Sequence, residues 1–242
     1  MMTSEILDQI PEPVLVLCAH PDDIEIHAGG TLARLVEAGK RVHCVLATSG
    51  NRGTADPSTT MDEVARIREA EQRAAAVALG VEDVTFLRFD DGDLQYEAQR
   101  LREAFIRRIR ATRPRALITH DPFPGNGSQD ACSIYPDHIT VGSTAFQAAF
   151  VCAPGPLFHP EHLAEGLSPW KPEVIYCTMS SQPDCFVDIT PVWLQKWTAI
   201  QQHQSQGRHL PGMEVFFRGI AREAGERAGL ELAESFRRLL PT

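Results

Sequence analysis

Short apolar runs alternate with longer amphipathic segments through the first half of this chain. The runs have strand length, and the segments between them repeat apolar residues at helical spacing. The expected strands are residues 14–19, 41–48, 84–88 and 116–119, and the expected helices are residues 31–38, 62–79 and 97–111. Strands joined by helices of this length form right-handed crossovers in a parallel sheet. The pattern therefore predicts an α/β fold with a Rossmann-like, mostly parallel sheet flanked by helices on both faces.

The second half of the chain has a less regular pattern. A polar loop is expected at residues 121–135, and a stretch rich in proline and glycine follows at 152–172. Helices are expected at 137–151, 191–204 and 216–240, the last with a break near Gly225 or Gly229, and short strands at 174–178 and 186–188. A length of 242 residues fits one large α/β domain, so residues 1–242 are expected to form a single domain.

Composition and charge narrow the class of protein. The net charge of −9 argues against nucleic acid or an anionic membrane as the main partner, because both attract basic surfaces. No apolar stretch approaches the roughly 20 residues that span a bilayer, and the acidic first 12 residues lack the anatomy of a signal peptide. The six cysteines contain no C-x-x-C pair, so a reducing, cytoplasmic location is expected.

Polar side chains follow each of the first four expected strands. Ligands of open parallel sheets bind beyond the carboxyl ends of the strands, so these side chains should gather at one rim. The groups in strand order are His20, Asp22 and Asp23; residues 49–52; Asp90, Asp91 and Asp93; and His120 and Asp121. We read the aspartates after the third strand as a solvated turn, because the spacing of a calcium-binding EF-hand is absent. The convergence as a whole predicts an enzyme.

The turn after the first strand holds the most concentrated chemistry. His20 and Asp23 are three residues apart across a proline-containing turn, so both can reach one metal ion. Asp22 then points elsewhere, where a general base for metal-bound water would stand. The spacing equally allows a turn in which a carboxylate caps the next helix and His20 packs as a neutral ring. A metal site also needs a third ligand, for which the candidates are histidines 27, 43, 120, 138, 159, 162, 203 and 209.

Two separated motifs then give a family resemblance. The stretch Ala19-His20-Pro21-Asp22-Asp23-Ile24-Glu25, the following Gly29-Gly30-Thr31-Leu32 and the distant Pro136-Asp137-His138 resemble the PIG-L/LmbE family of zinc-dependent N-deacetylases. Segments 48–53 and 203–206 extend the resemblance over most of the chain. The resemblance implies removal of an acyl group, usually acetyl, from a small amino sugar of the N-acetylglucosamine type. It also implies a possible homo-oligomer, a trimer or hexamer.

The resemblance assigns roles to individual residues. It implies that His20, Asp23 and His138 bind the metal, that Asp22 is the general base and that Asp137 orients a neighbouring ring. Without the family, His138 would be read as an ordinary residue at a helix start.

Two further residues receive an implied role in the substrate site. Arg52 resembles the family arginine that reaches toward substrate, where the alternative is an exposed loop arginine. His203 is expected either to face the site or to lie on a solvated helix.

Tyr135 marks a departure from the family pattern. Many relatives read H-x-D-H where this chain has Tyr135-Pro136-Asp137-His138. A tyrosine hydroxyl can donate a hydrogen bond to an oxyanion, but its pKa of about 10 makes it a poor proton shuttle. Either Asp22 carries the proton both ways or another histidine, His120 or His203, acts as the acid.

Several alternatives stay open at this point. Two imidazoles and a carboxylate suit zinc and also ferrous iron, which leaves a non-haem oxygenase as one alternative. A non-catalytic sugar-binding homologue and an amidohydrolase with a non-sugar amide substrate are the others. A dinucleotide enzyme is disfavoured, because no G-x-G-x-x-G turn follows the first strand. Substrate specificity is expected to lie in loops 51–60, 122–134 and 152–170.

Overall fold

The computed structural model describes residues 3–123 and 135–241, which form a seven-stranded sheet in the order β3-β2-β1-β4-β5-β7-β6. Five strands run parallel: β1 (Val14–Cys18), β2 (Val42–Thr48), β3 (Asp83–Phe89), β4 (Ala116–His120) and β5 (Val174–Thr178). Strand β7 (Ala233–Leu239) pairs antiparallel with both β5 and β6 (Cys185–Asp188). The mostly parallel sheet predicted from the sequence is confirmed.

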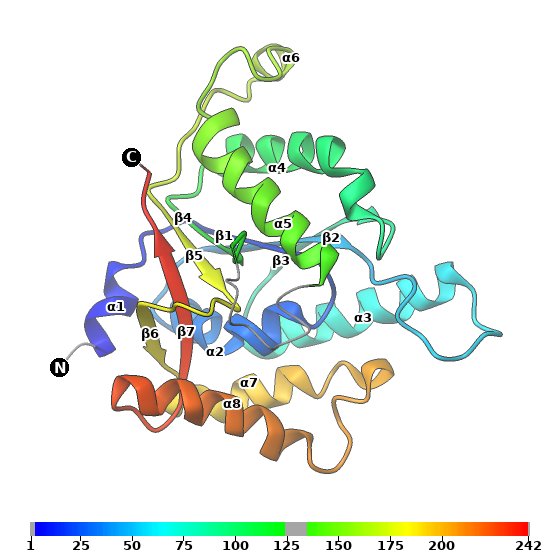
Figure 1. Cartoon of the computed structure of the whole chain (residues 1–242), viewed down its shortest axis with the longest axis vertical. Coiled ribbons are helices and arrows are strands. Elements are labelled where there is room, and N and C mark those ends of the chain that lie inside the picture. The colour runs from blue at the N-terminus through cyan, green and yellow to red at the C-terminus, as the bar shows by residue number, and fades with distance from the viewer. Residues whose placement is uncertain (1–2, 124–134, 242) are drawn as a thin grey trace.

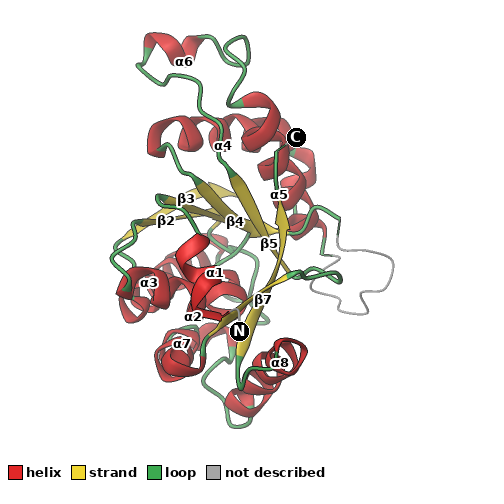
Figure 2. Ribbon diagram, turned by 90° about the vertical axis from the view of Figure 1, so that its left-hand side faces the viewer, coloured by secondary structure: helices red, strands yellow, loops and turns green. Residues whose placement is uncertain are grey.

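Helices cover both faces of the sheet (Figures 1 and 2). Helices α4 (Ala98–Thr112) and α5 (Pro136–Gln147) lie on one face, and a π-helical turn at Ala148–Cys152 extends α5. The other face carries α1 (Thr3–Gln9), α2 (Asp23–Glu37), α3 (Met61–Leu79), α7 (Trp193–Ile200) and α8 (Met213–Ala228). The short α6 (Glu161–Ala164) lies in an excursion beyond α4 (Figure 1). Among the described residues, no helix combines the length and apolarity needed to cross a bilayer.

Two buried clusters of apolar side chains fill the two layers. Leu15 and Leu17 of β1 point toward α4 and α5, while Val14, Val16 and Cys18 point toward α2 and its neighbours. Alternate residues of one strand face opposite sides of a sheet, so an unbroken apolar run places β1 at the centre of both layers. The C-terminal end of β1 is therefore held rigidly by both layers. The motif with His20 begins at this end.

Helix boundaries follow local signals at some points and tertiary contacts at others. Thr60 and Glu63 form a reciprocal capping box at the start of α3, and Gly80, with φ of +76°, ends that helix. Helix α2 begins at Asp23, eight residues before the expected start at residue 31. Helix α7 ends at Ile200 rather than at residue 204.

The expected helix at residues 216–240 is wrong in its second part. Helix α8 ends at Ala228 because Gly229 takes the left-handed conformation with φ of +72°. Residues Ala233–Leu239 form β7. Its charged residues are uncommon in a strand, so the sequence did not predict one here. Pairing with strands on both sides and burial of Glu234 outweigh a weak helical pattern.

Glu234 of β7 and Lys196 of α7 form a buried ion pair against the middle of α2. The two carboxylate oxygens of Glu234 accept hydrogen bonds from the amides of Gly30 (2.8 Å) and Thr31 (2.7 Å). Lys196 Nζ lies 2.5 Å from Glu234 Oε1 and donates to the carbonyl of Ile26 at 2.8 Å. In a regular α-helix, the Gly30 amide would donate to that same carbonyl. The ion pair thus engages both partners of one helical hydrogen bond, which lies one to two turns after Asp23.

Candidate metal and active site

The turn after β1 brings the first motif to the rim of the sheet. Asp22 precedes the first residue of α2 and has φ of 95°, a conformation that is costly for a residue with a side chain. Asp23 Oδ2 accepts a hydrogen bond from the amide of His20 at 2.8 Å, which closes the turn. Strained backbone of this kind concentrates at functional sites.

His20, Asp23 and His138 meet at one point. His20 Nδ1 lies 3.2 Å from His138 Nε2, and the Asp23 oxygens lie 3.4 Å from His138 Nε2 and 3.5 Å from His20 Nδ1. Ligand atoms about 2.1 Å from a tetrahedral zinc ion are themselves about 3.4 Å apart, so the spacing fits that ion. All three residues are buried. The first turn of α5 supplies His138, 115 positions after Asp23 in the chain.

Asp137 and Asp91 hold the far nitrogen of His20. His20 Nε2 lies 3.1 Å from Asp137 Oδ2 and 3.1 Å from Asp91 Oδ1. Asp137 also accepts hydrogen bonds from the amides of Gly92 at 2.7 Å and Leu94 at 3.3 Å. Burial disfavours the imidazolium, but hydrogen bonds with Asp137, Asp23 and Asp91 raise the pKa of His20 well above its ordinary value. Carboxylates behind a histidine ligand fix its tautomer and strengthen its basicity.

Asp23 is ionised in this arrangement. Burial would raise its pKa, but the neighbouring imidazoles of His138 and His120 hold the pKa well below the usual range. The ionised carboxylate of Asp23 and the imidazoles of His20 and His138 together form a donor set that suits zinc or another divalent metal.

Two arginines surround Asp22. Arg208 donates to Asp22 Oδ2 from Nε at 3.0 Å and from Nη2 at 2.7 Å, and Arg68 Nη2 lies 3.5 Å from Oδ1. Arg68 is itself buried and donates to the carbonyls of Gly50 and Pro21. Asp22 Oδ1 is therefore the less occupied oxygen of this carboxylate.

A cavity of about 560 Å³ opens over these groups. Its polar side contains His20, Asp22, Asp23, Arg68, Asp91 and His138. Its apolar lining consists of Ile26 from α2 with Phe216, Phe217 and Ile220 from α8, and His27, Gln206 and Arg208 line it as well. The described residues of loops 51–60 and 152–170 do not line this cavity, and residues 124–134 of the third expected specificity loop lie outside the described part of the chain.

Comparison with known proteins agrees with this geometry. The profile of the family PIG-L, described as GlcNAc-PI de-N-acetylase, matches residues 15–149. A diacetylchitobiose deacetylase of Thermococcus kodakarensis is 32% identical over 93% of this chain and 82% of its own length. The chain belongs to the PIG-L family.

Other relatives show how far the likeness extends. A 1D-myo-inositol 2-acetamido-2-deoxy-alpha-D-glucopyranoside deacetylase of Streptomyces scabiei is 32% identical over 71% of this chain, which spans 57% of that relative. The structure of N,N'-diacetylchitobiose deacetylase from Pyrococcus horikoshii matches with a TM-score of 0.85 and 30% identity, over 99% of this chain and 90% of that one. The protein TT1542 of Thermus thermophilus matches with a TM-score of 0.75 and 25% identity over 95% of each chain.

Tyr135 of this PIG-L protein stands directly beside the three candidate ligands. Its ring centre lies 5.6 Å from that of His20 and 5.5 Å from that of His138, and it lines the cavity. Burial raises the pKa of Tyr135 above its ordinary value, so the hydroxyl keeps its proton near neutrality. Its place suits a hydrogen-bond donor to a substrate oxygen.

His120 lies behind the ligands. Its ring stacks on His138 with centres 4.3 Å apart, and its Nε2 accepts a hydrogen bond from the Ala19 amide at 3.2 Å. Burial lowers the pKa of His120, and the nearby charge of His138 lowers it further. His120 is thus a buried ring next to Asp23, outside the residues that line the cavity.

The structure does not bring Arg52 or His203 into the cavity. Arg52 donates to the carbonyl of Asp91 at 2.6 Å and pairs with Asp93 at 2.7 Å. His203 is fully buried, and its Nε2 lies 3.1 Å from Glu25 Oε2. Arg52 can therefore act on the site by fixing the loop that carries Asp91.

A hydrogen-bonded chain connects His203 to the base. Glu25 accepts a hydrogen bond from Gln72 Nε2 at 2.6 Å, and Gln72 Oε1 accepts one from the Asp22 amide at 3.1 Å. The contact of His203 with the site is thus indirect, through Glu25 and Gln72.

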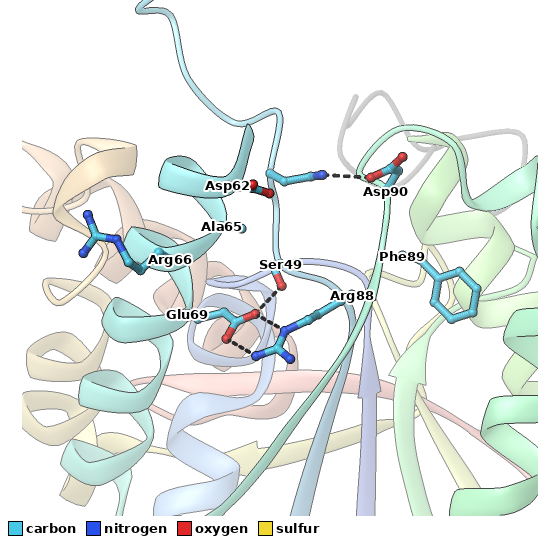
Figure 3. A pocket seen from close by; sticks show the side chains of 9 residues that line it. Ser49, Asp62, Ala65, Arg66, Glu69, Arg88, Phe89 and Asp90 are labelled. Carbon is cyan, nitrogen blue, oxygen red and sulfur yellow. Dashed lines mark hydrogen bonds and ion pairs between the residues drawn. The ribbon is translucent and has the colours of Figure 1, made fainter. Parts of the chain in front are cut away.

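A second hollow lies outside the metal cavity, at the ends of β2 and β3 (Figure 3). Glu69 accepts hydrogen bonds there from Ser49 at 2.6 Å and from Arg88 at 2.8 and 3.0 Å. Arg88 has φ of 60°, and the register of β2 and β3 shifts at the same place. This network fixes the end of β3, and hence the start of the loop with Asp90 and Asp91.

A further cluster, His159, Glu161 and His162, has metal-ligand residue types but is internally satisfied. His162 Nδ1 lies 3.3 Å from Arg110 Nη1, and its Nε2 lies 2.9 Å from Glu103. A guanidinium at one ring nitrogen disfavours a cation there. This cluster anchors the excursion with α6 to α4.

Sequence reasoning missed Arg68, Arg208 and the burial of Asp91. Asp91 follows the third strand and so has the positional signal, but the prediction of a solvated turn is wrong for this residue, which is buried. Arg68 shares a face of α3 with Val64, Gln72 and Ala75. This spacing is the signal that could have identified it as a buried charge. Arg208 has no such signal, because its partner Asp22 lies 186 positions away.

Proposed function

We propose that this protein hydrolyses the N-acetyl amide of an N-acetylglucosamine-type sugar or sugar conjugate, releasing acetate and a free amine. The observation that carries the proposal is the buried meeting of His20, Asp23 and His138 at tetrahedral ligand spacing. It occurs in a PIG-L protein whose relatives are deacetylases of diacetylchitobiose and of an acetamido-glucopyranosyl inositol. Two imidazoles and one carboxylate leave a coordination position open for water or substrate.

The residues present would divide the chemistry as follows. When bound by the three ligands, a divalent cation would supply Lewis acidity and would make the attacking water more acidic. Asp22 would take the proton from the attacking water at Oδ1, because Oδ2 is engaged by Arg208. Asp137 and Asp91 contact His20 Nε2 and would thereby leave Nδ1 available for a cation.

The remaining step concerns the substrate oxygen and nitrogen. The Tyr135 hydroxyl would donate a hydrogen bond to the carbonyl oxygen as negative charge develops on it. Asp22, once protonated, would return its proton to the leaving nitrogen, which makes a separate histidine acid unnecessary. The indirect placement of His203 and the burial of His120 support this assignment.

The metal is proposed to be zinc, with ferrous iron as the competing ion. The donor set suits both, so elemental analysis of the protein, purified without added metal, should be combined with reconstitution by each ion. Zinc at one equivalent that restores activity supports the proposal. Activity restored by iron alone contradicts it.

The decisive experiment scores amine release from a panel of substrates. Metal-loaded protein would be offered N-acetylglucosamine, diacetylchitobiose and a glucosaminyl-inositol conjugate, together with N-acetylated amines that lack a sugar. Equal amounts of acetate and free amine from the sugars support the proposal. Turnover of the non-sugar amides alone would identify a different amidohydrolase.

A non-catalytic sugar-binding protein is the second candidate. The contact of two Arg208 nitrogens with Asp22 Oδ2 favours it, because an ion pair of this kind can hold Asp22 in a structural role instead of a reacting one. Calorimetric binding of the same sugars without any acetate release would establish this alternative.

Cellular location and assembly remain predictions. The five described cysteines are unpaired, which supports the proposed reducing cytoplasm. The expected trimer or hexamer can be measured by light scattering during size-exclusion chromatography.

A further inference from the structure

The apolar wall of the metal cavity consists of side chains that are unusually exposed for their type. Phe216 is 57% exposed and Ile220 is 49% exposed, whereas Phe217 beside them is only 5% exposed. Phe216 and Ile220 are four residues apart in α8 and so share one face of that helix. Exposed apolar surface that lines a pocket is typical of a ligand-binding site.

Arg208 stands at the boundary between the polar and apolar sides. Its guanidinium lies 5.7 Å from the centre of the Phe217 ring and binds Asp22 through two nitrogens. The positive charge is thus neutralised by Asp22. The apolar residues of the lining are Ile26, Phe216, Phe217 and Ile220, and His27 and Gln206 add two polar side chains. The complement of the apolar residues is an uncharged apolar group.

From these observations we propose that the substrate carries an apolar aglycone, an aryl or alkyl group attached to the amino sugar, which packs against Phe216 and Ile220. The inference rests on the proposed function, because it assumes that the amide carbonyl lies at His20, Asp23 and His138. Those three residues are buried at the floor of the cavity, whereas Phe216 and Ile220 are half exposed. An acetyl group is small compared with the cavity of about 560 Å³, so we expect the amine side of the molecule to extend along the wall.

The size of the effect can be estimated from buried area. An aryl group that covers roughly 60 Å² more apolar surface on this wall than a methyl group should improve kcat/KM by about tenfold. A sugar without an apolar aglycone would leave Phe216 and Ile220 in contact with water.

The test compares three substrates of the metal-loaded, full-length protein. These are the methyl and phenyl β-glycosides of N-acetylglucosamine and the methyl glycoside of N-hexanoylglucosamine. We expect the phenyl glycoside to exceed the methyl glycoside about tenfold in kcat/KM, and the F216S/I220S variant to bring that ratio close to one. Val215→Ser is the matched control, because Val215 is 77% exposed on the same helix but does not line the cavity. It should leave the ratio unchanged.

Several results would overturn the proposal. Equal values for the methyl and phenyl glycosides would do so, as would a gain for the hexanoyl substrate in place of the phenyl one. Conversion of an oligomer to a monomer by F216S/I220S would identify the wall as a subunit contact instead. Calorimetry separates this inference from the proposed function: tighter binding of the phenyl glycoside without acetate release supports the aglycone site and rejects the deacetylase.

Discussion

Strands β1 to β4 run parallel and carry His20, Asp22 and Asp23 to one edge of the sheet, whereas β7 runs antiparallel between β5 and β6. The first region supplies two of the three candidate metal ligands and the proposed base within four consecutive residues. The C-terminal region, from α7 to β7, supplies Arg208, the apolar wall and the ion pair of Lys196 with Glu234. Two candidate ligands and the base are therefore encoded within one turn, whereas Arg208 and most of the apolar wall come from residues far away in the chain.

The sharpest test of the first region is His138→Ala. Loss of one of three protein ligands should weaken metal binding by at least about 10³-fold, because two donors cannot enclose the ion. Elemental analysis and competition with a chelator measure this. His209→Ala is the matched control, since His209 is exposed. Unchanged metal stoichiometry in His138→Ala would show that the third ligand is another residue.

The C-terminal region is tested by Lys196→Met. This change leaves Glu234 buried without its cation and should lower the free energy of unfolding by about 3–5 kcal/mol. Replacing both partners, as in K196M/E234L, should recover much of the loss. Denaturant unfolding provides the measurement, and exposed Lys171→Met provides the control. The affinity for metal should fall as well, because the ion pair contacts the helix that carries Asp23. A loss of stability with unchanged metal affinity would contradict this and show that α2 holds Asp23 in place without the ion pair.

Asp22→Asn tests the chemical step in the first region. The variant should keep its metal but lose about 10²-fold or more in kcat, because an amide cannot accept the proton from water. Steady-state kinetics with metal-loaded protein measures the loss, and Asp8→Asn, at an exposed position, should not change kcat. Full activity of metal-loaded Asp22→Asn would reject Asp22 as the base.

Tyr135→Phe is expected to have the smallest effect. Removing one hydrogen bond to the developing oxyanion should lower kcat by about tenfold, with little change in KM. Tyr96→Phe, on an exposed ring, is the matched control. An increase in KM with an unchanged kcat would indicate that Tyr135 only binds substrate.

The sequence allowed the parallel half of the fold and the candidate ligands to be predicted. Residues 14–18 form an unbroken apolar strand, and His20, Asp22 and Asp23 lie within one turn of the chain. Both signals can be recognised from neighbouring positions in the sequence. The third ligand, His138, required the family resemblance, because a histidine at a helix start has no signal of its own. The structure then places it within 3.4 Å of Asp23.

The remaining features depend on contacts that no local pattern reveals. Arg208 contacts a residue 186 positions earlier, and Glu234 contacts the amide of Gly30, 204 positions earlier. The prediction of a helix for the charged stretch at residues 234–238 is wrong. These residues form a strand because they pair with β5 and β6 on either side. Long-range pairing of this kind overrides local propensity.

The ion pair between Lys196 and Glu234 has a consequence for biosynthesis. The turn of α2 after Asp23 receives its outside hydrogen bonds only when residue 234 has left the ribosome and β7 has joined the sheet. A nascent chain that has already folded its parallel strands would thus still lack these contacts in the middle of α2. Completion of this helix is thereby tied to the end of translation.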